Sequence, residues 1–172
     1  MSANDEVGKV NQSLYFARLH CDSARQLLAE PNGQLPFARQ QSQCSLEAAV
    51  ECLYRALYFQ TLALLKDDGS SSQLLQQLQS APQTLAAIVK SYCQKGQGPE
   101  LNRLNEMLAS PSGLALLLQE YQAIWTVKST AKAVQIVDIS LTDTVLSLES
   151  CEQWMQDIIA MFEQFRASSA EY

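Results

Sequence analysis

The sequence predicts an all-α fold, a single-domain bundle of about six or seven helices, from two heptad repeats and a series of short proline-led segments. The first heptad opens the chain as one stripe of small and medium apolar residues: Val7, Val10, Leu14, Ala17, Cys21, Ala24 and Leu28. The second closes it: Leu148, Cys151, Met155, Ile158, Phe162 and Phe165. Each stripe follows one side of a helix, and such a stripe needs a partner surface to bury it.

Length and composition are those of one domain over residues 1–172. The chain has 172 residues and is 47% hydrophobic, so it can bury enough apolar surface to offset the entropy lost on ordering. We expect only the two ends, residues 1–6 and 168–172, to fray.

The first helix is predicted from about Asp5 to Ala29. Pro31 disfavours helix at the residue before it, and Gly33 permits a left-handed turn, so the chain should leave the helix here. Three further apolar residues are expected to widen the buried side of this helix: Phe16, Leu19 and Leu27. A wider apolar side suits a helix packed in a bundle.

The second helix should begin after Pro36, or at the latest at a Ser45 cap, and continue through Lys66. The sequence Asp67-Asp68-Gly69 then ends it. Near its C-terminal end this helix is apolar over most of its circumference, which makes it the candidate for the central element of the bundle.

Shorter helices are expected in the middle of the chain. Several of them are preceded by a serine or glycine and start at or next to a proline. Their approximate ranges are 72–79, 83–94, 99–109 and 111–127. The stretch 127–147 fits either a helix or a strand, and its β-branched residues favour an extended connector over Gln135–Leu141. The last helix is predicted from Ser147 to about Arg166.

Charge and composition argue against several classes of function. The net charge is −6, and the twelve lysines and arginines are spread along the chain, which disfavours nucleic-acid binding. The N-terminus carries no basic leader, and no apolar run approaches the roughly 18 residues that a membrane span needs. Five scattered cysteines without a C-x-x-C pair suggest reduced, mostly buried thiols. We therefore expect a cytoplasmic protein that binds neither nucleic acid nor membrane.

The sequence offers few residues for chemistry. His20 is the only histidine, so one chain cannot build a histidine-rich metal site, and the pattern Gly69-Ser70-Ser71-Ser72 lacks the lysine of a phosphate-binding loop. No catalytic residue, metal ligand or cofactor is predicted.

Two polar ladders provide the best candidate pocket. Arg18, Asp22 and Arg25 are spaced along one side of the first helix, and Glu47, Glu51 and Arg55 along the second. If these ladders faced each other inside the bundle, they would form a polar pocket with neighbouring tyrosines. Its binding residues would be Tyr15, Arg18, Asp22, Glu51, Arg55 and Tyr58. The alternative is a pair of ordinary solvated ladders on the surface.

Two segments carry a family resemblance. The sequence Asn11-Gln12-Ser13-Leu14-Tyr15-Phe16-Ala17-Arg18-Leu19, with Leu46-Glu47-Ala48-Ala49 and the tyrosine-rich second helix, resembles a family of small gammaproteobacterial proteins of unknown function. The resemblance implies a bacterial cytoplasmic protein with an all-helical fold, and it transfers no catalytic residue.

These observations favour a non-enzymatic protein-interaction or adaptor module, with a protein partner or self-association through an apolar helix face or the connector. The alternative is a small-molecule-binding or weakly enzymatic bundle that uses the polar pocket between the ladders. An exposed apolar patch would favour the first function, and a solvent-open cavity among the ladder residues would favour the second.

Overall fold

The computed structural model describes residues 3–29, 36–65, 83–94, 99–109, 113–125 and 146–170. These residues form six helices, so the all-α prediction is confirmed for the described part of the chain. The helices are α1 (Ala3–Ala29), α2 (Pro36–Leu65), α4 (Gln83–Cys93), α5 (Pro99–Ala109), α6 (Leu114–Trp125) and α7 (Leu148–Ala170).

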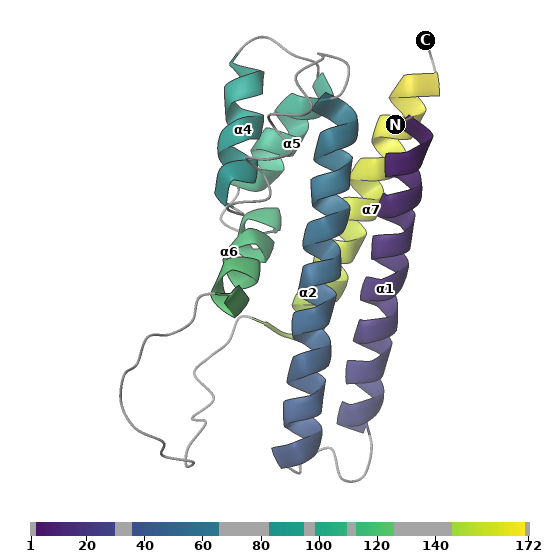
Figure 1. Ribbon diagram of the computed structural model, residues 1–172, viewed down its shortest axis with the longest axis vertical. Coiled ribbons are helices and arrows are strands. Elements are labelled where there is room, and N and C mark those ends of the chain that lie inside the picture. The colour runs from purple at the N-terminus through teal and green to yellow at the C-terminus, as the bar shows by residue number, and fades with distance from the viewer. Residues whose placement is uncertain are drawn as a thin grey trace.

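The three long helices lie side by side. α1 and α2 form an antiparallel hairpin, and α7 packs against both, so that the start of α1 and the end of α7 lie at the same end of the bundle (Figure 1). The shorter helices lie on the other side of α2. α6 packs against α2 and α7, and α4 and α5 pack on each other above it (Figure 1). α1 is therefore an edge helix, with α2 between it and the α4–α6 group.

One continuous core joins all six helices, and both heptads contribute to it. Leu28, predicted as the last member of the first stripe, is an exception, since it is 47% exposed in the last turn of α1. Five residues of the first stripe are buried: Val10, Leu14, Ala17, Cys21 and Ala24. The second stripe is buried from Cys151 to Phe165. Several residues along α2 are fully buried, among them Leu53 and Leu57. The expectation that α2 is the central element agrees with its contacts to α1, α6 and α7.

The expected widening of the α1 stripe is wrong for two of its three residues. Phe16 is 42% exposed and Leu19 is 46% exposed, while Leu27 is half-buried. Successive helical residues are about 100° apart, which turns Leu19 to the side opposite Ala17 and Cys21. α1 contacts only α2 and α7 closely, and these two neighbours cannot also cover its far side.

The helix boundaries follow local signals. Pro36 occupies the first position of α2 and Pro99 the first position of α5, where no amide hydrogen is needed. α7 starts where predicted, because the Ser147 hydroxyl oxygen accepts a hydrogen bond from the Ser150 amide at 3.1 Å and so caps the helix.

The N-terminal side of α6 differs from the expected start at Pro111. Gly113 has a φ of 99°, a left-handed conformation that favours glycine, and its carbonyl accepts the Leu116 amide at 3.0 Å. The helix consequently begins at Leu114. The expected helix at 72–79 and the expected connector at Gln135–Leu141 lie outside the described residues.

The described helices reach close to both ends of the chain, and the expected fraying of residues 1–6 and 168–172 stays a prediction. α1 already begins at Ala3, and the Glu6 side chain is only 3% exposed against the bundle. α7 continues to Ala170, past the predicted Arg166. Buried residues close to each end, Val10 in α1 and Phe165 in α7, hold these turns against the core.

Candidate functional site

The first polar ladder faces α7 and not α2. The Arg25 guanidinium forms ion pairs with Asp22 in the preceding turn and with Glu152 of α7. The carboxylates of Asp22 and Glu152 raise the pKa of Arg25, which stays charged. Arg18 points to solvent. This side of the ladder therefore joins two helices at the surface.

The second ladder faces α6. Tyr121 of α6 stacks on Tyr54 of α2, with ring centroids 3.9 Å apart and planes 14° apart. Burial is the main cause that raises the pKa of Tyr121, and the nearby Glu51 carboxylate raises it further, while Arg55 acts in the opposite direction. Glu51 and Arg55 thus lie close enough to the Tyr121 hydroxyl for their charges to act on it.

The two ladders do not come together as a pocket. Within the described residues no hydrogen bond or ion pair connects Arg18 or Asp22 with Glu51 or Arg55. Tyr58 is half-buried on α2, where its ring meets Phe59 edge-on at a centroid distance of 5.3 Å. Tyr15 points away from the bundle and is 59% exposed. The six residues predicted for one pocket therefore lie on three surfaces: the exposed side of α1, the side where α1 meets α7, and the side of α2 near α6.

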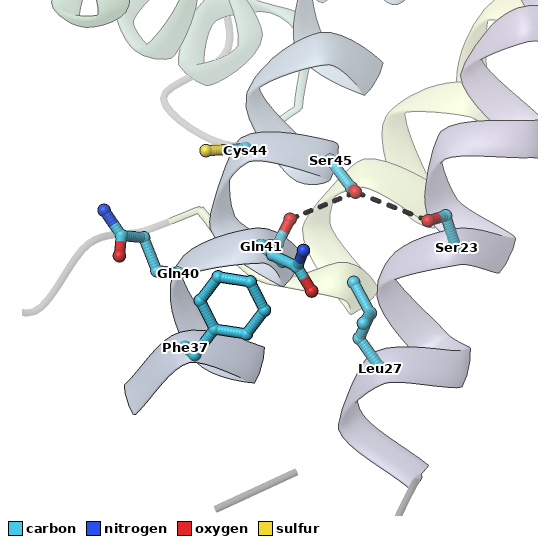
Figure 2. Close-up of a pocket in the computed structure, with 7 residues that line it drawn as sticks. All are labelled: Ser23, Leu27, Phe37, Gln40, Gln41, Cys44 and Ser45. Atoms are coloured by element: carbon cyan, nitrogen blue, oxygen red, sulfur yellow. Dashed lines mark hydrogen bonds between the residues drawn. The ribbon is translucent and has the colours of Figure 1, made fainter. Parts of the chain in front are cut away.

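A groove of about 590 Å³ lies elsewhere, between the C-terminal part of α1 and the N-terminal part of α2. Figure 2 shows Leu27 and Ser23 of α1 facing Phe37, Gln41 and Ser45 of α2 across it. Ser45 donates a hydrogen bond to the Gln41 carbonyl oxygen at 3.1 Å, and its hydroxyl lies 3.5 Å from that of Ser23. The groove is shallow, and no charged side chain lines it.

The cysteines divide into three environments. Cys21 of α1 and Cys151 of α7 are buried against each other, and hydrogen bonding to Cys21 together with burial raises the pKa of the Cys151 thiol. Burial also raises the pKa of Cys52 and of Cys93, whose thiol donates to the Leu101 carbonyl oxygen at 3.2 Å. Cys44 is exposed at the edge of the groove (Figure 2).

We expect Cys44 to react first with a thiol reagent such as Ellman's reagent, because reaction requires both access and thiolate. Cys21 and Cys151 should stay protected until the protein unfolds. The measurement is the number of protein thiols that react in a fast phase. The variant Cys44→Ser is the control, because it should remove this phase. A fast phase that persists in Cys44→Ser would contradict the burial of the other thiols.

A cluster of exposed apolar side chains occupies the middle of α1. Tyr15, Phe16 and Leu19 are 59%, 42% and 46% exposed, and the rings of Tyr15 and Phe16 lie 5.9 Å apart. We call the side of α1 that carries these three residues the outer α1 face. Among the described residues, the other large apolar side chains that are exposed lie in the first or last turn of their helices: Leu28, Phe37 and Trp125.

The sequence prediction placed Phe16 and Leu19 in the core and Tyr15 in a polar pocket, and so did not identify the outer α1 face. It was within reach of the sequence, because Tyr15 and Leu19 are about one helical turn apart and lie about half a turn away from the buried stripe.

Within the described ranges, no three His, Cys, Asp or Glu side chains are placed to share a metal ion. No described helix combines the length and apolar character that crossing a bilayer requires. No protein-family model, curated protein or solved structure shows a significant match to the chain. The resemblance to small gammaproteobacterial proteins therefore stays a prediction.

Proposed function

We propose that this protein is a non-enzymatic interaction module that binds an amphipathic helix of a protein partner along its outer α1 face. The observation that carries the proposal is the group of Tyr15, Phe16 and Leu19, which are adjacent in space and exposed in the middle of a long helix. Contiguous exposed apolar side chains of this kind mark interaction sites in soluble proteins, and tyrosine is enriched among the residues that dominate binding energy.

The position of α1 supports the same function. α1 is an edge helix whose inner stripe is anchored by α2 and α7, so the bundle holds the outer face rigidly (Figure 1). A partner helix could lie along this face without displacing any core residue. The polar ladders, by contrast, contact different helices within the described residues and so give less support to the small-molecule alternative.

Site-specific photocrosslinking in cells that express the chain tests this function. We would place p-benzoylphenylalanine at position 16 on the outer α1 face and, as a control, at the exposed position 102 of α5. We expect a discrete protein adduct from position 16 alone, and we expect Leu19→Glu in the same chain to abolish it. Equal labelling from both positions, or an adduct that survives Leu19→Glu, would overturn the proposal.

A further inference from the structure

Two buried thiols meet where α7 packs on α1. Cys21 of α1 is 1% exposed and Cys151 of α7 is 0% exposed, and a hydrogen bond joins their side chains. Both are free thiols, and only the packing of the last helix on the first brings them together. The proposed function uses the outer α1 face, so it gives no role to this pair on the inner side of the same helix.

A second contact fixes the register of the two helices beside this pair. Arg25, one turn after Cys21, forms an ion pair with Glu152, the residue that follows Cys151. The neighbouring residues of the buried stripe, one turn before and one turn after Cys21, are fully buried alanines, which let α1 approach its neighbours closely. Close approach matters because a disulfide needs the Cα atoms of its cysteines within about 7 Å of each other.

The two thiols differ in how readily they lose a proton. The hydrogen bond with Cys151 lowers the pKa of Cys21, and the Arg25 charge acts in the same direction, while burial and the carboxylates of Glu152 and Asp22 oppose them. The same hydrogen bond, together with burial, raises the pKa of Cys151. Because the thiolate is the nucleophilic form of cysteine, Cys21 is the member of the pair that reacts first with an oxidant.

The pair lies just beneath the surface. The ion-paired side chains next to it in sequence, Asp22, Arg25 and Glu152, all reach solvent. A peroxide, which is little larger than water, can reach a sulfur here through small movements of these side chains. Ellman's reagent, a bulky aromatic disulfide with two negative charges, requires the helices to separate.

We propose that Cys21 and Cys151 form a site of reversible oxidation, at which hydrogen peroxide converts the two thiols to a disulfide that ties α1 to α7. The inference is independent of the proposed function, because it concerns the inner side of α1 and needs no protein partner.

The reaction has two steps. The Cys21 thiolate attacks one peroxide oxygen, the O–O bond breaks, and Cys21 becomes a sulfenic acid while the other oxygen takes up the proton that Cys21 lost and leaves as water. The Cys151 sulfur then attacks the Cys21 sulfur, the S–O bond breaks, and the departing hydroxide leaves with the Cys151 proton as a second water. The two sulfurs are oxidised by two electrons in total, and the peroxide is reduced by two. A dithiol reductant restores the two thiols by exchange.

The first test uses the full-length Cys44→Ser chain, which lacks the exposed thiol and so avoids crosslinks between chains. After treatment with hydrogen peroxide, the unfolded protein should show two fewer reactive thiols and migrate faster on a non-reducing gel. Its Tm should rise by roughly 5 to 15 °C, because the bridge closes a long loop in the unfolded chain. Dithiothreitol should reverse all three changes. An unchanged thiol count, or a lower Tm after oxidation, would overturn the proposal.

A second test establishes the partners. Cys52 of α2 is close enough to Cys21 for their charges to interact, so it is the competing partner. In the Cys44→Ser chain, Cys52→Ala should leave the gel shift intact, and Cys151→Ser should abolish it. Circular dichroism checks that each variant is folded. A gel shift that survives Cys151→Ser, or one that Cys52→Ala removes, would contradict the assignment.

Dimedone, which captures sulfenic acids, tests the order of the two steps. Each variant is treated with peroxide and then unfolded in urea with dimedone present. We expect Cys151→Ser, which keeps a hydrogen-bond donor beside Cys21, to carry the label on Cys21. The matched variant Cys21→Ser should show at most weak labelling of Cys151, whose thiol holds its proton more tightly. Stronger labelling of Cys151 than of Cys21 would overturn the roles given to the two thiols.

Discussion

Leu53→Ala is expected to lower the free energy of unfolding by about 2 to 5 kcal/mol, the range measured for leucine truncations in well-packed cores. Leu53 is fully buried in α2, the helix that contacts α1, α6 and α7. Removing its side chain loses the transfer free energy of the deleted carbons and leaves a cavity that rigid neighbouring helices only partly fill. Urea denaturation followed by circular dichroism measures the loss.

Leu28→Ala supplies the matched comparison, since the same chemical change is made at a residue that is 47% exposed. We expect its free energy of unfolding to change by about 1 kcal/mol or less, because much of that side chain is already in water. Similar losses in Leu53→Ala and Leu28→Ala would show that α2 is not the central element of the core.

Tyr54 is expected to make stability fall as the pH rises from about 10 to about 12, in addition to the loss from the buried thiols. Burial, with smaller contributions from Tyr121 and Tyr58, raises the pKa of Tyr54 from 10.0 to about 12 in the folded protein. Below pH 10 the phenol is neutral in both states and its contribution to stability is complete. Between the two values the unfolded chain ionises while the folded one does not, so unfolding becomes more favourable. The difference corresponds to roughly 3 kcal/mol.

Tyr54→Phe isolates this contribution. The phenylalanine ring keeps the stacking on Tyr121 but has no proton to lose, so its stability should fall less steeply over the same range. The measurement is the free energy of unfolding of both proteins at several pH values between 9 and 12. Parallel curves for the two proteins would show that Tyr54 ionises equally in the folded and unfolded states.

Much of the fold could be predicted because its signals are local. The heptad through Val10, Ala17 and Cys21 identifies the buried side of α1, since the period of the stripe matches the helix itself. Pro99 and Ser147 place the starts of α5 and α7, because an N-terminal proline and a serine cap act within one turn. Such features need no knowledge of the neighbouring elements.

The candidate site was less predictable. The two polar ladders have the spacing expected of ion-pair networks, yet the partner of Arg25 is Glu152, 127 residues away along the chain. The second ladder meets Tyr121 because α6 happens to cover that side of α2. Spacing along a helix defines which residues share a side, and it contains no information about which other helix that side will meet.

The sequence by itself determined the all-α class, the helices that begin at Pro36, Pro99 and Ser147, and the inner stripe of α1, because these depend on dihedral preferences and helical period. Only the tertiary structure decided that Phe16 and Leu19 stay in water. Both are apolar residues on a helix, and their burial depends on how many neighbours surround that helix. With α2 and α7 packed against one side of α1, the other side stays exposed.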